Sequence, residues 1–196
     1  MRPFSRRSIA CWVAWLPAAL VAAGELPCGA KLNVDTQAAE LGTQVRVTLG
    51  IAAPREVVWN AITDYAHATQ FIHHLQHSSA ETLGVNHLRV QQTGRVGKGP
   101  FTTLVHTLYE VRLQPDQYQL EAELVGGDLR HMRMSSRLQA NVTDAYTTLQ
   151  YAATIDPGNW VPLWLAEPVL RQSAQESFQD LALEIAKRSP TCPKGF

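Results

Sequence analysis

The chain has 196 residues with 17 basic and 17 acidic side chains, so its formal net charge is zero. Proteins that bind nucleic acid draw much of their affinity from lysine and arginine, and this sequence has neither a basic excess nor a basic block, which excludes that class. A hydrophobic content of 45% excludes a disordered chain, and the length suits one globular domain.

The first 23 residues have the pattern of a secretory signal peptide. Arg2, Arg6 and Arg7 precede an uncharged run over residues 9–23, which ends in the small residues that a signal peptidase requires. The run is shorter than the roughly 20 apolar residues of a membrane-spanning helix, and Pro17 interrupts it. We therefore expect cleavage after residue 23 and a secreted or periplasmic protein, with a retained anchor as the alternative.

Cleavage there would change the cysteine count from three to two, because Cys11 lies in the removed segment. Cys28 then lies near the new N-terminus and Cys192 near the C-terminus, in a compartment that permits disulfides. Since the termini of a domain often lie close together, we expect a disulfide between Cys28 and Cys192. Two free thiols are the alternative.

The elements of the remaining chain follow from its hydrophobic periodicity. Residues 24–42 are interpreted as an N-terminal extension, and residues 43–51 alternate as a half-buried strand does. Pro54 and Glu56 are typical of a helix start, which predicts a short helix over 54–63, followed by a second helical stretch over 64–74. Further strands are predicted over residues 76–83, 87–96, 101–113, 118–125, 129–139 and 145–155.

The C-terminal part of the chain predicts a long amphipathic helix. Residues 156–168 hold three prolines and are interpreted as an ordered linker, and residues 190–196 as a tail. Between them, one apolar stripe recurs at steps of three and four: Leu170, Ala174, Phe178, Leu181 and Ile185. The result is an α+β fold, a curved antiparallel sheet of about seven strands around this helix, with a space between them for a small apolar ligand.

Local patterns in this order over residues 45–188 resemble the START-like superfamily, also called SRPBCC, in its polyketide cyclase and coenzyme Q-binding branch. They are Ala53 to Trp59, Thr63-Asp64-Tyr65, Phe71-Ile72, Gly126-Gly127-Asp128, Leu149-Gln150-Tyr151 and Pro162-Leu163-Trp164. The resemblance implies a helix-grip domain, here residues 43–189, whose sheet and C-terminal helix enclose a hydrophobic cavity.

We expect a protein that binds a hydrophobic small molecule, such as a lipid, quinone or isoprenoid, in that cavity. No Gly-x-Ser-x-Gly motif is present, and Gly97-Lys98-Gly99 lacks the spacing of a nucleotide-binding loop, so we expect no catalytic residue and no cofactor. The residues predicted to line the cavity are Tyr65, Phe71, Val105, Tyr109, Met132, Met134, Tyr151, Trp164 and Phe178.

The alternative is an enzyme of the cyclase or dehydratase kind acting on a polyketide-like substrate. It requires Asp64, His106 or His131 to face the cavity and move protons there. On the strand over 129–139, however, alternation places His131 opposite the face that Met132 and Met134 share.

Two further groups of side chains carry hypotheses of their own. His73, His74 and His77 have no supporting carboxylate or thiolate at a recognised spacing, so we expect no metal site. Trp160 and Trp164 are either ordinary packing residues or a hydrophobic gate that touches a membrane transiently, because tryptophan favours such interfaces.

Overall fold

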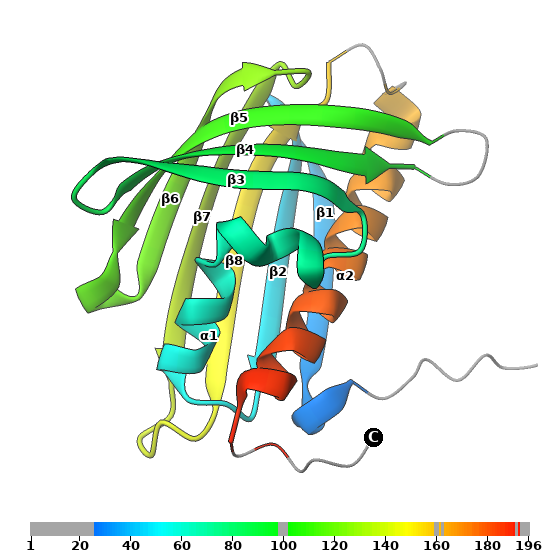
Figure 1. The fold of residues 1–196 in the computed structure, drawn as a ribbon. Helices are drawn as coiled ribbons and strands as arrows, with labels where there is room; N and C mark the ends of the chain where they lie inside the picture. The colour runs from blue at the N-terminus through cyan, green and yellow to red at the C-terminus, as the bar shows by residue number, and fades with distance from the viewer. Residues whose placement is uncertain (1–25, 98–101, 159–160, 162, 191, 193–196) are drawn as a thin grey trace, which may run out of the picture.

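An eight-stranded antiparallel sheet curves around the helices of the protein (Figure 1). The computed structural model describes residues 26–97, 102–158, 161, 163–190 and 192. The sheet order is β1-β2-β8-β7-β6-β5-β4-β3, so chain neighbours lie side by side except where β8 returns next to β2. The strands are β1 Lys31–Ala39, β2 Gly42–Ile51, β3 Leu75–Gly84, β4 His87–Val96, β5 Thr103–Gln114, β6 Gln119–Gly127, β7 His131–Ala140 and β8 Thr147–Asp156.

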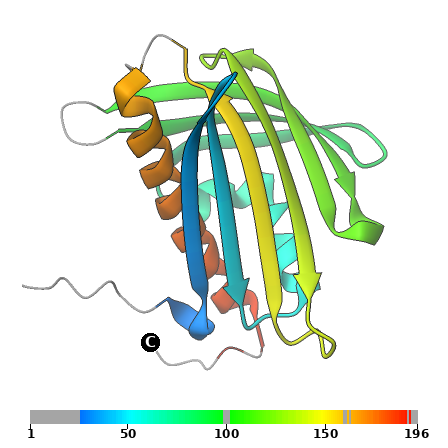
Figure 2. The same cartoon turned by 180° about the vertical axis from the view of Figure 1, so that it is seen from behind.

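The helices occupy the inside of the curve. α1 (Arg55–Ile62) and the 3₁₀ helix η2 (Tyr65–Gln70) connect β2 to β3, and α2 (Leu163–Arg188) follows β8. The short 3₁₀ helices η1 (Pro27–Gly29) and η4 (Pro115–Gln117) lie at the start of the described chain and between β5 and β6. α2 packs on β1 and β2, while α1 packs against β7, β8 and α2 (Figure 2).

Alternation along the strands places one apolar face against the helices. Leu49, Ile51, Val111 and Leu149 are fully buried there, and Ile185 of α2 meets them. The predicted α+β helix-grip fold is therefore confirmed, including the apolar stripe of the C-terminal helix.

The sheet has one strand more than the sequence predicts. β1 lies in the segment interpreted as an extension, and it pairs with β2 along its whole length. Only Val34 and Thr36 of β1 are buried, and the Thr36 hydroxyl donates to Glu167 Oε1 of α2 at 3.2 Å. An edge strand with so few inward apolar residues gives a weak alternation signal.

α2 begins earlier than predicted, because its first turns include residues interpreted as linker. Pro168 lies inside this helix, near its N-terminal end. Pro168 is the sixth residue of the helix, where a backbone N–H would donate to the carbonyl of residue 164, so the proline removes one hydrogen bond of the second turn. The helix continues through this position, and it begins at Leu163 instead of after residue 168.

A disulfide joins Cys28 to Cys192, as predicted. The two Cα atoms lie 5.3 Å apart, and both side chains are buried. The bond attaches η1 to the segment that follows α2, so it connects the two ends of the described chain. The predicted signal peptide lies outside the described residues, and none of the described helices has the length and apolarity needed to cross a bilayer.

Candidate functional site

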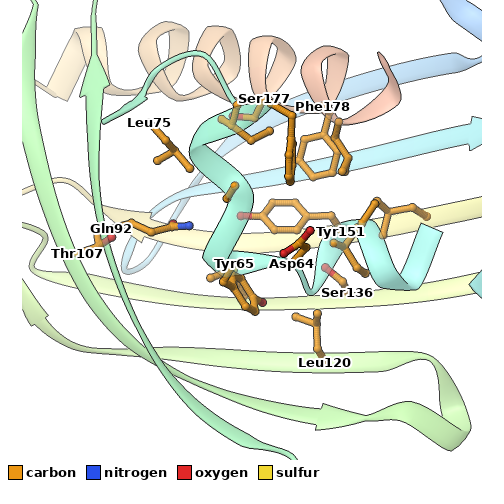
Figure 3. A pocket seen from close by; sticks show the side chains of 18 of the residues that line it. Asp64, Tyr65, Leu75, Gln92, Thr107, Leu120, Ser136, Tyr151, Ser177 and Phe178 are labelled. Atoms are coloured by element: carbon orange, nitrogen blue, oxygen red, sulfur yellow. The ribbon is translucent and has the colours of Figure 1, made fainter. Parts of the chain in front are cut away.

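A cavity of about 280 Å³ lies between the sheet and the helices (Figure 3). α2 contributes Ser177 and Phe178 on one side, and Tyr65 and Leu120 lie on the opposite side of Tyr151 (Figure 3). Most of the lining side chains are apolar, which suits an apolar ligand. The lining residues are Ala61, Ile62, Asp64, Tyr65, Ala68, Phe71, Ile72, His74, Leu75, Gln92, Thr107, Tyr109, Leu120, Met132, Met134, Ser136, Leu149, Tyr151, Ser177, Phe178 and Leu181.

The structure brings most of the predicted lining residues together around this cavity. Val105 of β5 is buried but does not border it, and the side chain of Trp164 lies outside the described part of the structure. Ligand binding by the seven predicted residues that do border the cavity stays a prediction. The predicted residues that do border the cavity are Tyr65, Phe71, Tyr109, Met132, Met134, Tyr151 and Phe178.

Three tyrosines from separate elements contribute aromatic wall and hydroxyl groups. The rings of Tyr65 and Tyr109 meet edge to face, with 6.3 Å between their centroids. The ring centroids of Tyr151 and Phe178 lie 5.1 Å apart. Burial raises the pKa of Tyr65 and Tyr109 well above the ordinary value, and it raises the pKa of Tyr151 to about 12. All three hydroxyls therefore stay protonated and neutral near pH 7.

A chain of hydrogen bonds fixes the polar part of the wall. The Tyr109 hydroxyl donates to Gln92 Oε1 at 2.9 Å, and Gln92 Nε2 donates to Ser78 Oγ at 3.1 Å. Ser78 Oγ in turn donates to the backbone oxygen of Tyr65 at 2.6 Å. These bonds connect β5, β4 and β3 to η2, so Tyr65 and Tyr109 keep a defined relative position.

Asp64 is the one carboxylate that borders the cavity among the described residues. It accepts hydrogen bonds from His67 Nδ1 at 2.6 Å and from Arg188 Nη2 at 3.0 Å. Burial alone would raise the pKa of Asp64, but the hydrogen bonds and charges of His67 and Arg188 outweigh it and lower the pKa. Asp64 is therefore ionised near neutral pH.

His74 lies at the same cavity, next to α2. Its Nε2 lies 3.3 Å from Ser177 Oγ, and the preceding His73 pairs through Nδ1 with Asp180 Oδ1 at 2.8 Å. Burial lowers the pKa of His74, although Asp180 and Glu176 act against the shift, so its imidazole is neutral near pH 7. In the described ranges, no three His, Cys, Asp or Glu side chains gather in a way that could hold a metal ion.

The other two groups of the catalytic alternative point elsewhere. The His106 side chain is 58% exposed and pairs through Nδ1 with Asp128 Oδ2 at 2.8 Å. His131 does not border the cavity, whereas Met132 and Met134 do, as the alternation along β7 predicts. Of the three proposed acid or base groups, Asp64 alone reaches the cavity.

A family model described as polyketide cyclase / dehydrase and lipid transport matches residues 51–182, about two thirds of the chain. The chain belongs to this family. The match contains α1, η2, strands β3 to β8 and most of α2, so it contains every element that lines the cavity.

Solved structures agree with this polyketide cyclase and lipid transport fold. The STAR-related lipid transfer protein of Xanthomonas axonopodis aligns over 80% of this chain and 93% of its own, with a TM-score of 0.64 and 13% identity. The Zhui aromatase/cyclase of a Streptomyces species aligns over 74% and 94%, with a TM-score of 0.63 and 14% identity. Human STARD10 aligns over 80% of this chain and 69% of its own, with a TM-score of 0.63 and 14% identity. No curated protein matches the sequence.

The polar lining residues Gln92, Thr107 and Ser136, which come from three strands, were not predicted from the sequence. Ser136 shares its face of β7 with the two methionines, and Thr107 shares its face of β5 with Tyr109. The same period of two that identified Met132 and Met134 would have found these hydroxyls, had inward polar residues been included.

Proposed function

We propose that this protein is an exported binding protein that holds a hydrophobic small molecule, such as a lipid, quinone or isoprenoid, in the cavity between the sheet and α2. The observation that carries the proposal is the convergence of apolar and aromatic side chains from α1, η2, six strands and α2 on one cavity of about 280 Å³. The similarity to a STAR-related lipid transfer protein and to STARD10 supports a lipid-like ligand.

Export rests on two separate observations. The sequence begins with the arginine-containing segment and apolar run of a signal peptide, and the structure contains a disulfide between Cys28 and Cys192. Expression of a fusion of the full chain to a reporter that folds only after export tests this part. Activity of the reporter in the exported fraction, lost when residues 1–23 are deleted, is the expected result.

A role in binding is favoured over catalysis by the state of the polar groups at the cavity. Asp64 is ionised and held by two partners, so it is a poor proton donor and a weak base. Two observations support the cyclase or dehydratase alternative. The neutral imidazole of His74 lies beside Ser177 at the cavity, and the fold is similar to that of the Zhui aromatase/cyclase.

Native mass spectrometry of the purified protein, with extraction of its bound molecules, tests the binding function. We expect an apolar ligand to copurify with the wild type. The Ala68→Phe variant places a large ring at a buried position of the cavity wall and should lose the ligand, whereas Ala66→Phe adds the same ring at an exposed position of η2 and should keep it. Protein that is always empty and gains no thermal stability from any apolar compound would overturn the proposal.

We further propose transient membrane contact through Trp160 and Trp164, because indole rings favour the membrane interface. Flotation with liposomes is the measurement. Replacing both tryptophans with alanine should reduce the floated fraction, while Ala68→Phe should leave it unchanged.

A further inference from the structure

The cavity contains polar groups but no cationic side chain. None of its lining residues in the described part of the chain is a lysine or an arginine, and the one imidazole, that of His74, is neutral near pH 7. An anionic head group that entered this space would lose water and meet no positive partner in the wall.

The charge that is present acts against an anion. Asp64 is ionised, and Arg188 reaches its Oδ2 while not bordering the cavity itself. Because that guanidinium also donates to Glu184 Oε1 at 2.9 Å, two carboxylates share its positive charge. The wall therefore presents the cavity with a carboxylate whose two hydrogen-bond partners, His67 and Arg188, do not border the cavity.

Hydroxyl groups in the same wall remain available to a ligand. The Tyr109 hydroxyl already donates to Gln92, but the hydroxyls of Tyr65, Tyr151 and Ser136 have no hydrogen-bond partner within the described chain. Ser136 lies directly opposite Tyr151 in the β7–β8 register, and both residues border the cavity. None of these three oxygens is fully buried without a partner, so each is accessible from the cavity, where a ligand oxygen can take the place of water.

The size of the space limits the ligand further. About 280 Å³ lies just below the range of roughly 300–1,000 Å³ typical of pockets for drug-sized ligands. A compact molecule can be enclosed in it, while a two-chain phospholipid cannot be enclosed whole.

We propose that the cavity selects a compact, electrically neutral molecule with an apolar body and one hydroxyl or carbonyl oxygen, bound by the hydroxyls of Tyr65 and Tyr151, and that it rejects the corresponding carboxylate. This inference rests on the proposed binding function, since it names the chemical class of ligand for the same cavity.

Titration of the full, disulfide-bonded protein with 2-naphthol and 2-naphthoate at pH 7 tests the selectivity, because the two probes share one ring system and differ in charge. We expect 2-naphthol to bind at least tenfold more tightly. Equal or tighter binding of 2-naphthoate would overturn the inference and leave the binding function intact. The same conclusion would follow if an apolar ligand can be extracted from the protein but 2-naphthol does not bind to it. Protein that is empty by mass spectrometry and binds neither probe would overturn both.

The anchoring hydroxyls are tested with a double variant, Tyr65→Phe with Tyr151→Phe. The double variant should bind 2-naphthol about tenfold more weakly, since a hydrogen bond in a buried site contributes roughly that factor to affinity. Its affinity for naphthalene should be unchanged. Tyr118→Phe is the matched control, because its hydroxyl donates to Glu56 Oε2 at 3.2 Å, away from the cavity. Wild-type affinity for 2-naphthol in the double variant would refute the anchor.

The role of the carboxylate is tested with Asp64→Asn, which keeps the shape of the side chain and removes its charge. The ratio of the two affinities should shift at least tenfold in favour of 2-naphthoate. If the ratio does not shift in Asp64→Asn, the carboxylate does not exclude anions and the inference fails in that part.

Discussion

The carboxylate of Asp64 and the guanidinium of Arg188 form an ion pair, with 3.0 Å between Oδ2 and Nη2. The pair connects the segment between α1 and η2 to the C-terminal end of α2, and both side chains are largely shielded from solvent. The same guanidinium lies 5.3 Å from the centre of the Phe71 ring, another residue of the cavity wall. Arg188 thus positions two residues of the cavity without bordering it.

Replacing Arg188 with methionine should lower the free energy of unfolding by about 1–2 kcal/mol, because the partly buried Asp64 would lose its charged partner while the aliphatic part of the side chain is kept. Urea denaturation measures this change. Lys187→Met is the control, since its side chain is 69% exposed and its ion pair among the described residues is with Glu184, so its loss should change the free energy of unfolding by less than about 0.5 kcal/mol. Equal effects of the two variants would contradict the structural role of Arg188.

Gly127→Ala should lower the free energy of unfolding by about 1–3 kcal/mol. Gly127 ends β6 with φ of +113°, a conformation that favours glycine, and an added Cβ would collide with the backbone oxygen of His106. The neighbouring Gly126→Ala is the control, because its Cβ would meet only the side chain of Leu108 at 3.7 Å. Thermal unfolding followed by circular dichroism should therefore separate these two adjacent substitutions, and similar melting temperatures would show that the backbone around Gly127 adjusts to the added Cβ.

Removal of the disulfide by the double substitution Cys28→Ala with Cys192→Ala should lower the free energy of unfolding by about 2–5 kcal/mol. The bond closes a loop with a sequence separation of 164, and loss of such a constraint increases the conformational freedom of the unfolded chain. Urea unfolding with and without a reductant is the measurement. Reductant should shift the wild type to the stability of the variant and should not affect the variant, whereas a wild type that is insensitive to reductant at complete reduction would contradict this prediction.

Periodicity predicted the strands and the long helix because each has one face in the core. The alternation of the sequence was enough to assign Met132 and Met134 to the cavity side of β7, since their neighbours Arg133 and Ser135 are polar. β1 escaped prediction because an edge strand that packs against one helix needs few apolar residues.

The polar partners at the cavity could not be predicted in this way. The Tyr109 hydroxyl meets Gln92 from the neighbouring strand, and Asp64 meets Arg188 from the far end of the chain. Such pairs depend on strand register and on the docking of α2, which hydrophobic alternation does not specify. The same limit explains why periodicity did not predict that His74, considered from sequence only with His73 and His77 as a metal ligand, borders the cavity.

The burial of His74 predicts a pH dependence of stability. Its pKa in the folded protein is lowered from the ordinary value of 6.5, so between the two values the unfolded chain binds more protons than the folded one. Stability must then rise with pH: the contribution is complete above about pH 6.5 and is lost as the pH falls through the lowered pKa. Asp180 and Glu176 of α2 oppose the shift, and His73 adds to it, but burial is the larger effect.

The His74→Gln variant has no imidazole to protonate and should therefore lose less stability than the wild type between pH 7 and pH 5. Urea unfolding at several pH values gives the difference in free energy between the two proteins, which should move in favour of the variant as the pH falls. His77→Gln serves as the control for the loss of an imidazole as such, because that side chain is exposed on β3. A His74→Gln difference that is constant with pH would mean that the imidazole charges as easily in the folded protein as in the unfolded chain, and the cavity would then have to be more accessible to water than its lining implies.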